Sequence, residues 1–234
     1  MIILIIGLAT LATFGSWMLL SSKALRYGLG LLSLLVLAGS VYLLTDHFVN
    51  HTGMTVENRV VTQKIYTAGD SKLPYGVLVY KDLGSKASSK VLVYRAGKED
   101  KDAKAHFIPD TKHAMEAVKK TATYQLADVK EAQVKTTTKR YVWKSKTAKL
   151  LYGFGGESGE LVSQKSVVQV PKKTWLVLSQ DQAKKLAGLA KQLQGQMAAD
   201  PAKAQAMQAL AKSNPEAYAE MQVSAIKKAL KIKD

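Results

Sequence analysis

The sequence predicts an α+β protein that begins with a helical hairpin, continues as a mostly antiparallel β-sheet and ends in a helical tail. Two apolar runs without a charged side chain occupy residues 1–20 and 28–45, so we assign residues 1–45 to the hairpin. Residues 46–178 are rich in β-branched and aromatic residues that often alternate with polar ones, as in strands. Residues 179–234 carry helix-forming Ala, Gln and Lys in helical patterns.

Both apolar runs are long enough to cross a membrane. A helix rises about 1.5 Å per residue, so a hydrocarbon core of about 30 Å needs about 20 residues. Trp17 lies where an interfacial aromatic residue is common. A cleaved signal peptide would need basic residues before the first run, and none is present. We therefore expect a protein of the plasma membrane with two spans in contact with lipid.

The loop between the two runs predicts the orientation of the chain. It contains Lys23 and Arg26, whereas the next basic residues after the second run are Arg59 and Lys64. Basic residues in short loops favour the cytoplasmic side, and long domains have little influence. We expect the loop in the cytoplasm and the rest of the chain outside the cell.

Small residues in the first run suggest helix packing. Ala9 and Thr13, and likewise Ala12 and Ser16, stand four positions apart on one helix face. Small side chains let membrane helices approach closely, either within the hairpin or against another membrane protein. Ordinary packing against lipid remains the alternative.

The net charge of the chain indicates which kinds of partner it can attract. Residues 46–234 hold all 18 acidic residues and 32 of the 34 basic ones, a net charge of 32 − 18 = +14. Such a domain attracts anionic lipid head groups or an anionic wall polymer, although a solvated basic surface is the simpler interpretation. The sequence has no compact basic cluster with interleaved aromatic residues, so it does not predict nucleic-acid binding. The absence of cysteine excludes thiol chemistry and disulfides, and it fits a Gram-positive envelope.

The middle region contains eight expected strands. The near copies VLVYK (77–81) and VLVYR (91–95) predict a hairpin. A helix is expected over Pro109–Lys120, capped by Asp110. The expected strands are Val56–Thr67, Gly76–Lys81, Lys90–Arg95, Thr121–Val129, Ala132–Lys144, Lys149–Phe154, Leu161–Val170 and Thr174–Leu178.

Three helices are expected in the tail. Ser179 and Gln182 have the spacing of a capping box, which starts the first helix. Pro201 and Pro215 suit the first positions of the second and third helices. The tail covers the protein's own sheet or docks on a partner, and we favour the sheet. The apolar stripe of the first helix consists of Ala183, Leu186, Ala190, Leu193 and Met197.

The glycine-rich segment GFGGESG (153–159) lacks the spacing of a dinucleotide fingerprint and the Lys-Ser/Thr pair of a phosphate-binding loop. We expect a hairpin turn between two strands. Glu157 and Glu160 flank this turn, and a glycosidase would need such carboxylates to face each other across a cleft. Beside a tight turn we expect both to be exposed, so they do not predict catalysis.

The histidines offer two weak metal-binding patterns. His47 and His51 stand four positions apart on a helix, and His106, Asp110 and His113 could converge if Pro109 starts a helix. Neither pattern is a strong zinc signature, and polar residues at the membrane interface are the simpler interpretation of the first pair. Tyr141 and Trp143 share one face of a strand and fit a core cluster better than a carbohydrate platform. We expect no metal ion or other cofactor.

These patterns favour a non-enzymatic accessory protein that packs on a polytopic membrane protein such as a transporter. A binding or sensing module for wall polymer or lipid head groups is the alternative, and an envelope enzyme acting on glycan or lipid is a third. The segments NRVVTQKIY (58–66), GFGGESGEL (153–161) and TWLVLSQDQAKKL (174–186), with the two apolar runs, resemble an uncharacterised Gram-positive bacterial membrane-protein family. Its members have two N-terminal spans and a C-terminal domain of unknown function. The resemblance implies a cell-membrane location and supplies no catalytic residues.

Overall fold

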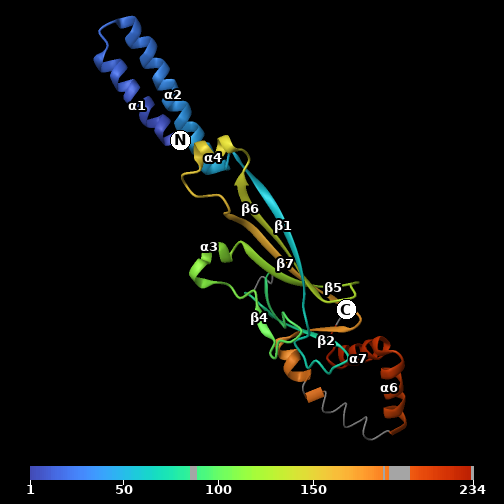
Figure 1. The fold of residues 1–234 in the computed structure, drawn as a ribbon. Coiled ribbons are helices and arrows are strands. Elements are labelled where there is room, and N and C mark those ends of the chain that lie inside the picture. Colours follow the sequence, from blue (N-terminus) through green and yellow to red (C-terminus); the bar gives the residue numbers. More distant parts are fainter. Residues whose placement is uncertain (85–88, 187, 190–200, 233–234) are drawn as a thin grey trace. The chain divides into compact units, whose positions relative to one another are not determined.

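The computed structural model of the chain describes residues 1–84, 89–186, 188–189 and 201–232 (Figure 1). The chain divides into two compact units that alternate along the sequence. Unit 1 comprises residues 1–58 and 139–162, and unit 2 comprises residues 59–138 and 163–234. Helices, two sheets and a helical C-terminal region confirm the α+β class expected from the sequence.

Unit 1 begins with the expected helical hairpin. Helix α1 spans Ile2–Leu19 and α2 spans Lys23–Asn50, and the two helices lie side by side (Figure 1). Both are long and apolar enough to cross a membrane. Most of their large apolar side chains are exposed, which is unusual for a protein surrounded by water.

Two four-stranded sheets follow. The first has the order β1-β6-β7-β5, and the second has the order β4-β3-β2-β8. Strands β2 and β3 form the expected antiparallel hairpin, whereas the pairs β2–β8 and β5–β7 are parallel. The strands are β1 (Met54–Lys64), β2 (Gly76–Asp82), β3 (Lys90–Tyr94), β4 (Lys104–His106), β5 (Lys120–Ala127), β6 (Gln133–Trp143), β7 (Leu161–Pro171) and β8 (Trp175–Ser179).

Unit 2 has a core on each face of its β4-β3-β2-β8 sheet. Side chains alternate between the faces of a strand, so Leu78 of β2 joins the first core and Val77 joins the second. The first core also contains Val168 and Val170 of β7, from the other sheet. The second contains Ala219, Val223 and Ile226, the apolar stripe of one C-terminal helix.

The helices of the C-terminal region begin at the residues predicted from the sequence. The Ser179 hydroxyl accepts a hydrogen bond from the Gln182 N–H at 3.2 Å, and the Gln182 side chain accepts from the Ser179 N–H at 2.9 Å. This confirms the capping box, and residues 180–186 are helical. Helix α6 spans Pro201–Ser213 and α7 spans Pro215–Ala229, so both prolines hold the first helical position. The predicted stripe residues Ala190, Leu193 and Met197 lie outside the described residues.

Helix α7 packs on the sheet of its own unit, as we favoured. Its residues Ala219, Val223 and Ile226 are almost fully buried against Tyr75 and Leu176. Burial of three such side chains supplies the hydrophobic free energy that an isolated helix of this length lacks.

The strand expected over Lys149–Phe154 is wrong. These residues belong largely to helix α4, which spans Lys146–Tyr152. Ser145 is its N-cap, and the Ser145 hydroxyl accepts a hydrogen bond from the Ala148 N–H at 3.0 Å. The glycine-rich segment therefore connects a helix to β7 and is not a hairpin turn between two strands.

The helix expected over Pro109–Lys120 is shorter than predicted. Asp110 is a cap, because its side chain accepts a hydrogen bond from the Lys112 N–H, but only a 3₁₀ turn (Thr111–His113) and α3 (Ala114–Ala117) follow. The segment buries little apolar area, since Met115 and Val118 are exposed. Strand β5 already begins at Lys120, where pairing with β7 ends the helix.

Candidate functional site

The interior of the hairpin is lined by small residues. Ala9 and Ser16 of α1 are buried, as are Gly30, Ser33 and Ser40 of α2. The hydroxyl oxygens of Thr13 and Ser33 lie 3.0 Å apart, at hydrogen-bonding distance between the helices. Three of the four predicted packing residues therefore contact or approach the neighbouring helix of the same chain.

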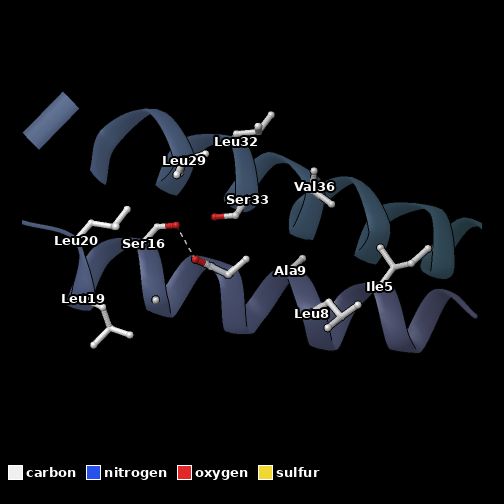
Figure 2. A pocket seen from close by; sticks show the side chains of 12 residues that line it. Ile5, Leu8, Ala9, Ser16, Leu19, Leu20, Leu29, Leu32, Ser33 and Val36 are labelled. Atoms are coloured by element: carbon white, nitrogen blue, oxygen red, sulfur yellow. Dashed lines mark hydrogen bonds between the residues drawn. The ribbon is translucent and has the colours of Figure 1, made fainter. Parts of the chain in front are cut away.

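A groove of about 670 Å³ runs along one side of the hairpin (Figure 2). Ala12, the fourth predicted packing residue, is exposed and lines this groove. Small residues in its lining leave room beside the backbone, and leucines from both helices line it as well. The lining residues are Ile5, Leu8, Ala9, Ala12, Gly15, Ser16, Leu19, Leu20, Leu29, Leu32, Ser33 and Val36.

The two basic residues of the hairpin lie at its closed end. Lys23 is exposed and is the first residue of α2. Arg26 donates two hydrogen bonds to the main-chain oxygen of Leu20, at 3.1 and 2.8 Å. This contact satisfies a carbonyl that the end of α1 leaves without an intrahelical partner. Arg26 thus stabilises the turn, whatever its effect on orientation.

A second cluster surrounds His47 at the other end of α2. The His47 side chain is 1% exposed. Its ring stacks on Tyr152 of α4, with centroids 4.4 Å apart, and on Trp143 of β6, at 5.6 Å. All of these residues belong to unit 1, so the cluster joins the last turns of α2 to the helix and strand that follow much later in the chain.

The hydrogen bonds of His47 fix the state of its ring. Its Nδ1 lies 2.7 Å from the main-chain oxygen of Thr52, which can only accept, so Nδ1 carries a proton. The other nitrogen, Nε2, lies 3.8 Å from Oε1 of Glu157. Neither Nε2 nor either carboxylate oxygen of Glu157 has a hydrogen-bond partner among the described residues, and all three atoms are buried. Buried polar atoms are nearly always paired, so this arrangement is exceptional.

Two glycines make room for the cluster. Gly53 has φ +89°, which favours glycine, and a side chain there would lie 3.1 Å from Ala148 of α4. At Gly155 a Cβ atom would lie 2.7 Å from Cδ of Glu157. Within the glycine-rich segment, Gly155 therefore allows Glu157 to fold back against His47.

The exposure predicted for Glu157 from the sequence is wrong. We expected it to be exposed beside a turn, but its side chain is only 15% exposed. Glu160 is exposed, as expected. The glycine excess around Glu157 was the available signal, because close packing of a loop requires small neighbours.

The other predicted ligands do not form a metal site. His51 stacks on Tyr141 with centroids 4.0 Å apart, so His47 and His51 contact different aromatic rings. His106 stacks on Tyr94 at 3.9 Å. Among the residues that the structure describes, no three His, Asp or Glu side chains converge as metal ligands would.

Asp110 and His113 do form a pair on the surface of unit 2. Their side chains lie 2.7 Å apart, and the hydrogen bond between them lowers the pKa of Asp110 and raises the pKa of His113. Both groups are exposed, so solvent and salt weaken the interaction. The pair therefore supplies neither a buried charge nor a site.

Comparison with known proteins identifies the family. A family model described as a domain of unknown function (DUF4811) matches residues 22–186, and the chain belongs to this family. The match includes α2, all eight strands and the His47 cluster, and it leaves out α1, α6 and α7. No curated protein and no solved structure matches the chain.

Proposed function

We propose that this member of the DUF4811 family is a non-enzymatic accessory protein of a Gram-positive plasma membrane, whose hairpin binds a helix of a polytopic membrane protein. The groove between α1 and α2 is the observation that carries the proposal. Its apolar lining suits the hydrocarbon interior, where helices associate through close packing at small residues. Ala12 and Gly15 line it together with leucines of both helices, and their small side chains leave room for the convex face of another helix.

A helix is a better occupant than a lipid chain for a geometric reason. The groove is lined by residues between Ile5 and Leu19 of α1, by Leu20 just after it, and by residues between Leu29 and Val36 of α2. About 15 residues of α1 correspond to about 22 Å of helix, so the groove follows most of the hydrocarbon core. A partner helix can maintain contact over this length, and it gains packing that flexible acyl chains supply less well.

Photocrosslinking of the intact protein in native membranes tests the proposal. A photoreactive residue at position 12 should form an adduct with one protein, and peptide mapping should place the bond within an apolar helix of that protein. The same residue at position 35 should label lipid, because Leu35 is exposed and does not line the groove. Adducts with lipid alone at position 12 would contradict the proposal.

A matched pair of substitutions sharpens the test. Ala12→Leu fills the groove, whereas Ala38→Leu adds the same atoms at an exposed position of α2 outside it. The first should reduce recovery of the partner at least about tenfold, the effect of losing about 1.4 kcal/mol of packing. The second should leave recovery unchanged. Equal recovery from both variants would disprove a role for the groove.

The soluble part is proposed to lie outside the cell, as Lys23 and Arg26 predict. The chain has no cysteine, so single thiols report the side of the membrane without background. Ser71→Cys, an exposed position of unit 2, should react with an impermeant maleimide in intact cells. Ser22→Cys in the hairpin loop should react only after permeabilisation. The reverse pattern would overturn the orientation.

Binding of an anionic polymer or lipid head group is the second candidate, and one observation supports it. A hollow of about 740 Å³ in unit 2 is bordered by four lysines and a single acidic residue, Glu220. Lys173 pairs with Glu220 at 3.2 Å. The lysines are Lys172, Lys173, Lys227 and Lys228.

Vesicle binding separates this candidate from the first. The full protein in detergent-free nanodiscs should bind phosphatidylglycerol vesicles and not phosphatidylcholine vesicles, with an affinity that falls as salt rises. Lys172→Gln with Lys228→Gln should weaken binding, while Lys104→Gln with Lys139→Gln, at exposed positions that do not line the hollow, should change it less. Equal losses from both pairs would indicate diffuse charge instead of a site.

A further inference from the structure

The His47 cluster places two hydrogen-bond acceptors against each other. Because Nδ1 of His47 donates to Thr52, the neutral ring has only a lone pair at Nε2. That lone pair faces Oε1 of Glu157 at 3.8 Å, and an ionised carboxylate offers only lone pairs as well. Two buried acceptors with no donor between them lose the hydrogen bonds they would make in water.

We propose that His47 and Glu157 together bind one further proton, held between Nε2 and Oε1, and that this proton fastens the 153–160 loop to the end of α2. One proton satisfies both groups at once. Placed on Nε2, it gives an imidazolium that donates to the carboxylate, and placed on Oε1, it gives a carboxylic acid that donates to the ring. The inference depends on the cluster alone and not on what the groove binds.

A proton fits this site better than a metal ion. Protein zinc sites use three or four ligands, and only one nitrogen and one carboxylate converge here. The cluster is also closed by aromatic rings, since Trp143 and Tyr152 stack on the imidazole and Phe48 lies 5.6 Å from it. Such apolar surroundings lower the local dielectric constant and strengthen the interaction of a charged pair.

The titratable groups around His47 leave Glu157 as its ionic partner. On α2 itself, Asp46 bonds instead to Asn50 and Thr52, and His51 stacks on Tyr141. From α4 the facing group is the Tyr152 ring, and from β6 it is Trp143, which does not titrate. Lys144, which follows β6, is exposed, and its main-chain N–H donates to the main-chain oxygen of Gly53.

Uptake of the proton would make the position of the 153–160 loop, at the end of α2, depend on pH. With the proton present, Nε2 and Oε1 attract each other, and their approach from 3.8 Å to hydrogen-bonding distance would hold Glu157 and the loop against α2 through a buried, charge-assisted bond. Without it, an ionised carboxylate faces a lone pair and the loop loses this contact.

Nuclear magnetic resonance of the full chain in nanodiscs tests the proposal. With ¹⁵N-labelled histidine, the His47 signals, assigned with His47→Gln, should shift between about pH 8 and pH 5 as the pair takes up its proton. If the proton resides on Glu157, infrared spectra should instead show a protonated carboxyl band that Glu157→Gln abolishes. Amide hydrogen exchange in residues 153–160 should be about tenfold slower with the proton bound.

Two variants make the result decisive. Glu157→Gln supplies an amide N–H to Nε2 at every pH, so the shift of the His47 signals and the pH dependence of loop exchange should both disappear. Glu160→Gln, three residues away and exposed, should leave both unchanged. If His47 stays neutral and Glu157 stays ionised from pH 8 to pH 5, or if Glu157→Gln titrates like the natural protein, the proposal is wrong.

Discussion

The hydroxyl groups of Thr13 and Ser33 meet between α1 and α2 at 3.0 Å, and each also lies within hydrogen-bonding distance of a main-chain oxygen of its own helix. This contact links the helices at a point where the surrounding side chains are apolar. It is a directional contact between side chains of the two helices, and it therefore favours one rotational setting of the helices over others.

We expect Thr13→Val to lower the free energy of unfolding of the hairpin by about 0.5–2 kcal/mol, the usual range for such bonds between membrane helices. Thr10→Val is the matched control, because the Thr10 hydroxyl is exposed and bonds to Ile6 of its own helix. Titration of the micelle-bound protein with a denaturing detergent, followed by helicity, measures the difference. Equal stability of the two variants would show that the contact between the helices contributes nothing.

The close approach of Trp17 to Gly30 makes a second prediction. A Cβ atom at Gly30 would lie 2.9 Å from Cε2 of the Trp17 ring, whereas at Gly39 it would meet nothing within 4 Å. Both glycines are in α2, so Ala gains the same helix propensity at either position. Gly30→Ala should lose about 1–3 kcal/mol through overpacking relative to Gly39→Ala. The same detergent titration would show it, and Gly30→Ala as stable as Gly39→Ala would contradict it.

Some features of the chain were predictable because neighbouring residues determine them. The apolar runs gave the helices of the hairpin, and the Ser179–Gln182 spacing gave the capping box. The strand at Lys149–Phe154 was wrong because Leu150, Leu151, Tyr152 and Phe154 form a short apolar run that fits either element. Ser145 marks the start of a helix here, because it is the N-cap of α4. It lacks the Glu or Gln three residues later that completes a capping box and makes such a start recognisable in the sequence.

The candidate site was predictable only in part, because it depends on distant segments. His47 was recognised as a polar residue near the membrane, but its partner Glu157 lies on a loop that follows β6 and α4. Which two groups meet depends on the pairing of strands, and sequence periodicity does not specify pairing. For the same reason the parallel pairs β2–β8 and β5–β7 did not emerge from the sequence.

A buried hydroxyl pair in unit 2 allows a direct measurement of coupling. Thr136 Oγ1 and Ser166 Oγ lie 3.0 Å apart, and Ser166 is fully buried. Thr136→Val or Ser166→Ala alone leaves a hydroxyl without its partner and should cost about 1–2 kcal/mol in urea unfolding. The double variant should cost less than the sum by at least about 0.5 kcal/mol. Simple additivity would show that the hydroxyls do not interact.

Tyr94 makes the stability of unit 2 sensitive to alkali. Burial raises its pKa to about 12, because the neutral phenol is favoured inside the core. Its contribution is therefore complete below the ordinary pKa near 10 and is lost as the pH rises to about 12, a loss of about 2–3 kcal/mol. Tyr94→Phe keeps the ring and cannot ionise. Its unfolding free energy should decline less between pH 10 and 12 than that of the half-buried control variant Tyr66→Phe.

The absorbance of the phenolate group follows the same event. The natural protein should show one tyrosine that ionises near pH 12 and that is missing in Tyr94→Phe. Identical alkaline profiles for Tyr94→Phe and Tyr66→Phe would mean that burial of Tyr94 does not limit stability at high pH.

The pairing of β2 with β8 has a consequence for how the chain folds during synthesis. Gly76 is aligned with Trp175, so β2 leaves the ribosome about one hundred residues before its parallel neighbour exists. The first segment of unit 1 likewise precedes residues 139–162, which contain Trp143, Tyr152 and Glu157. Non-local pairs of this kind fold slowly and leave an edge strand open meanwhile. A nascent chain stalled before residue 139 would present the hairpin with an unfinished sheet, which is a natural substrate for chaperones and proteases.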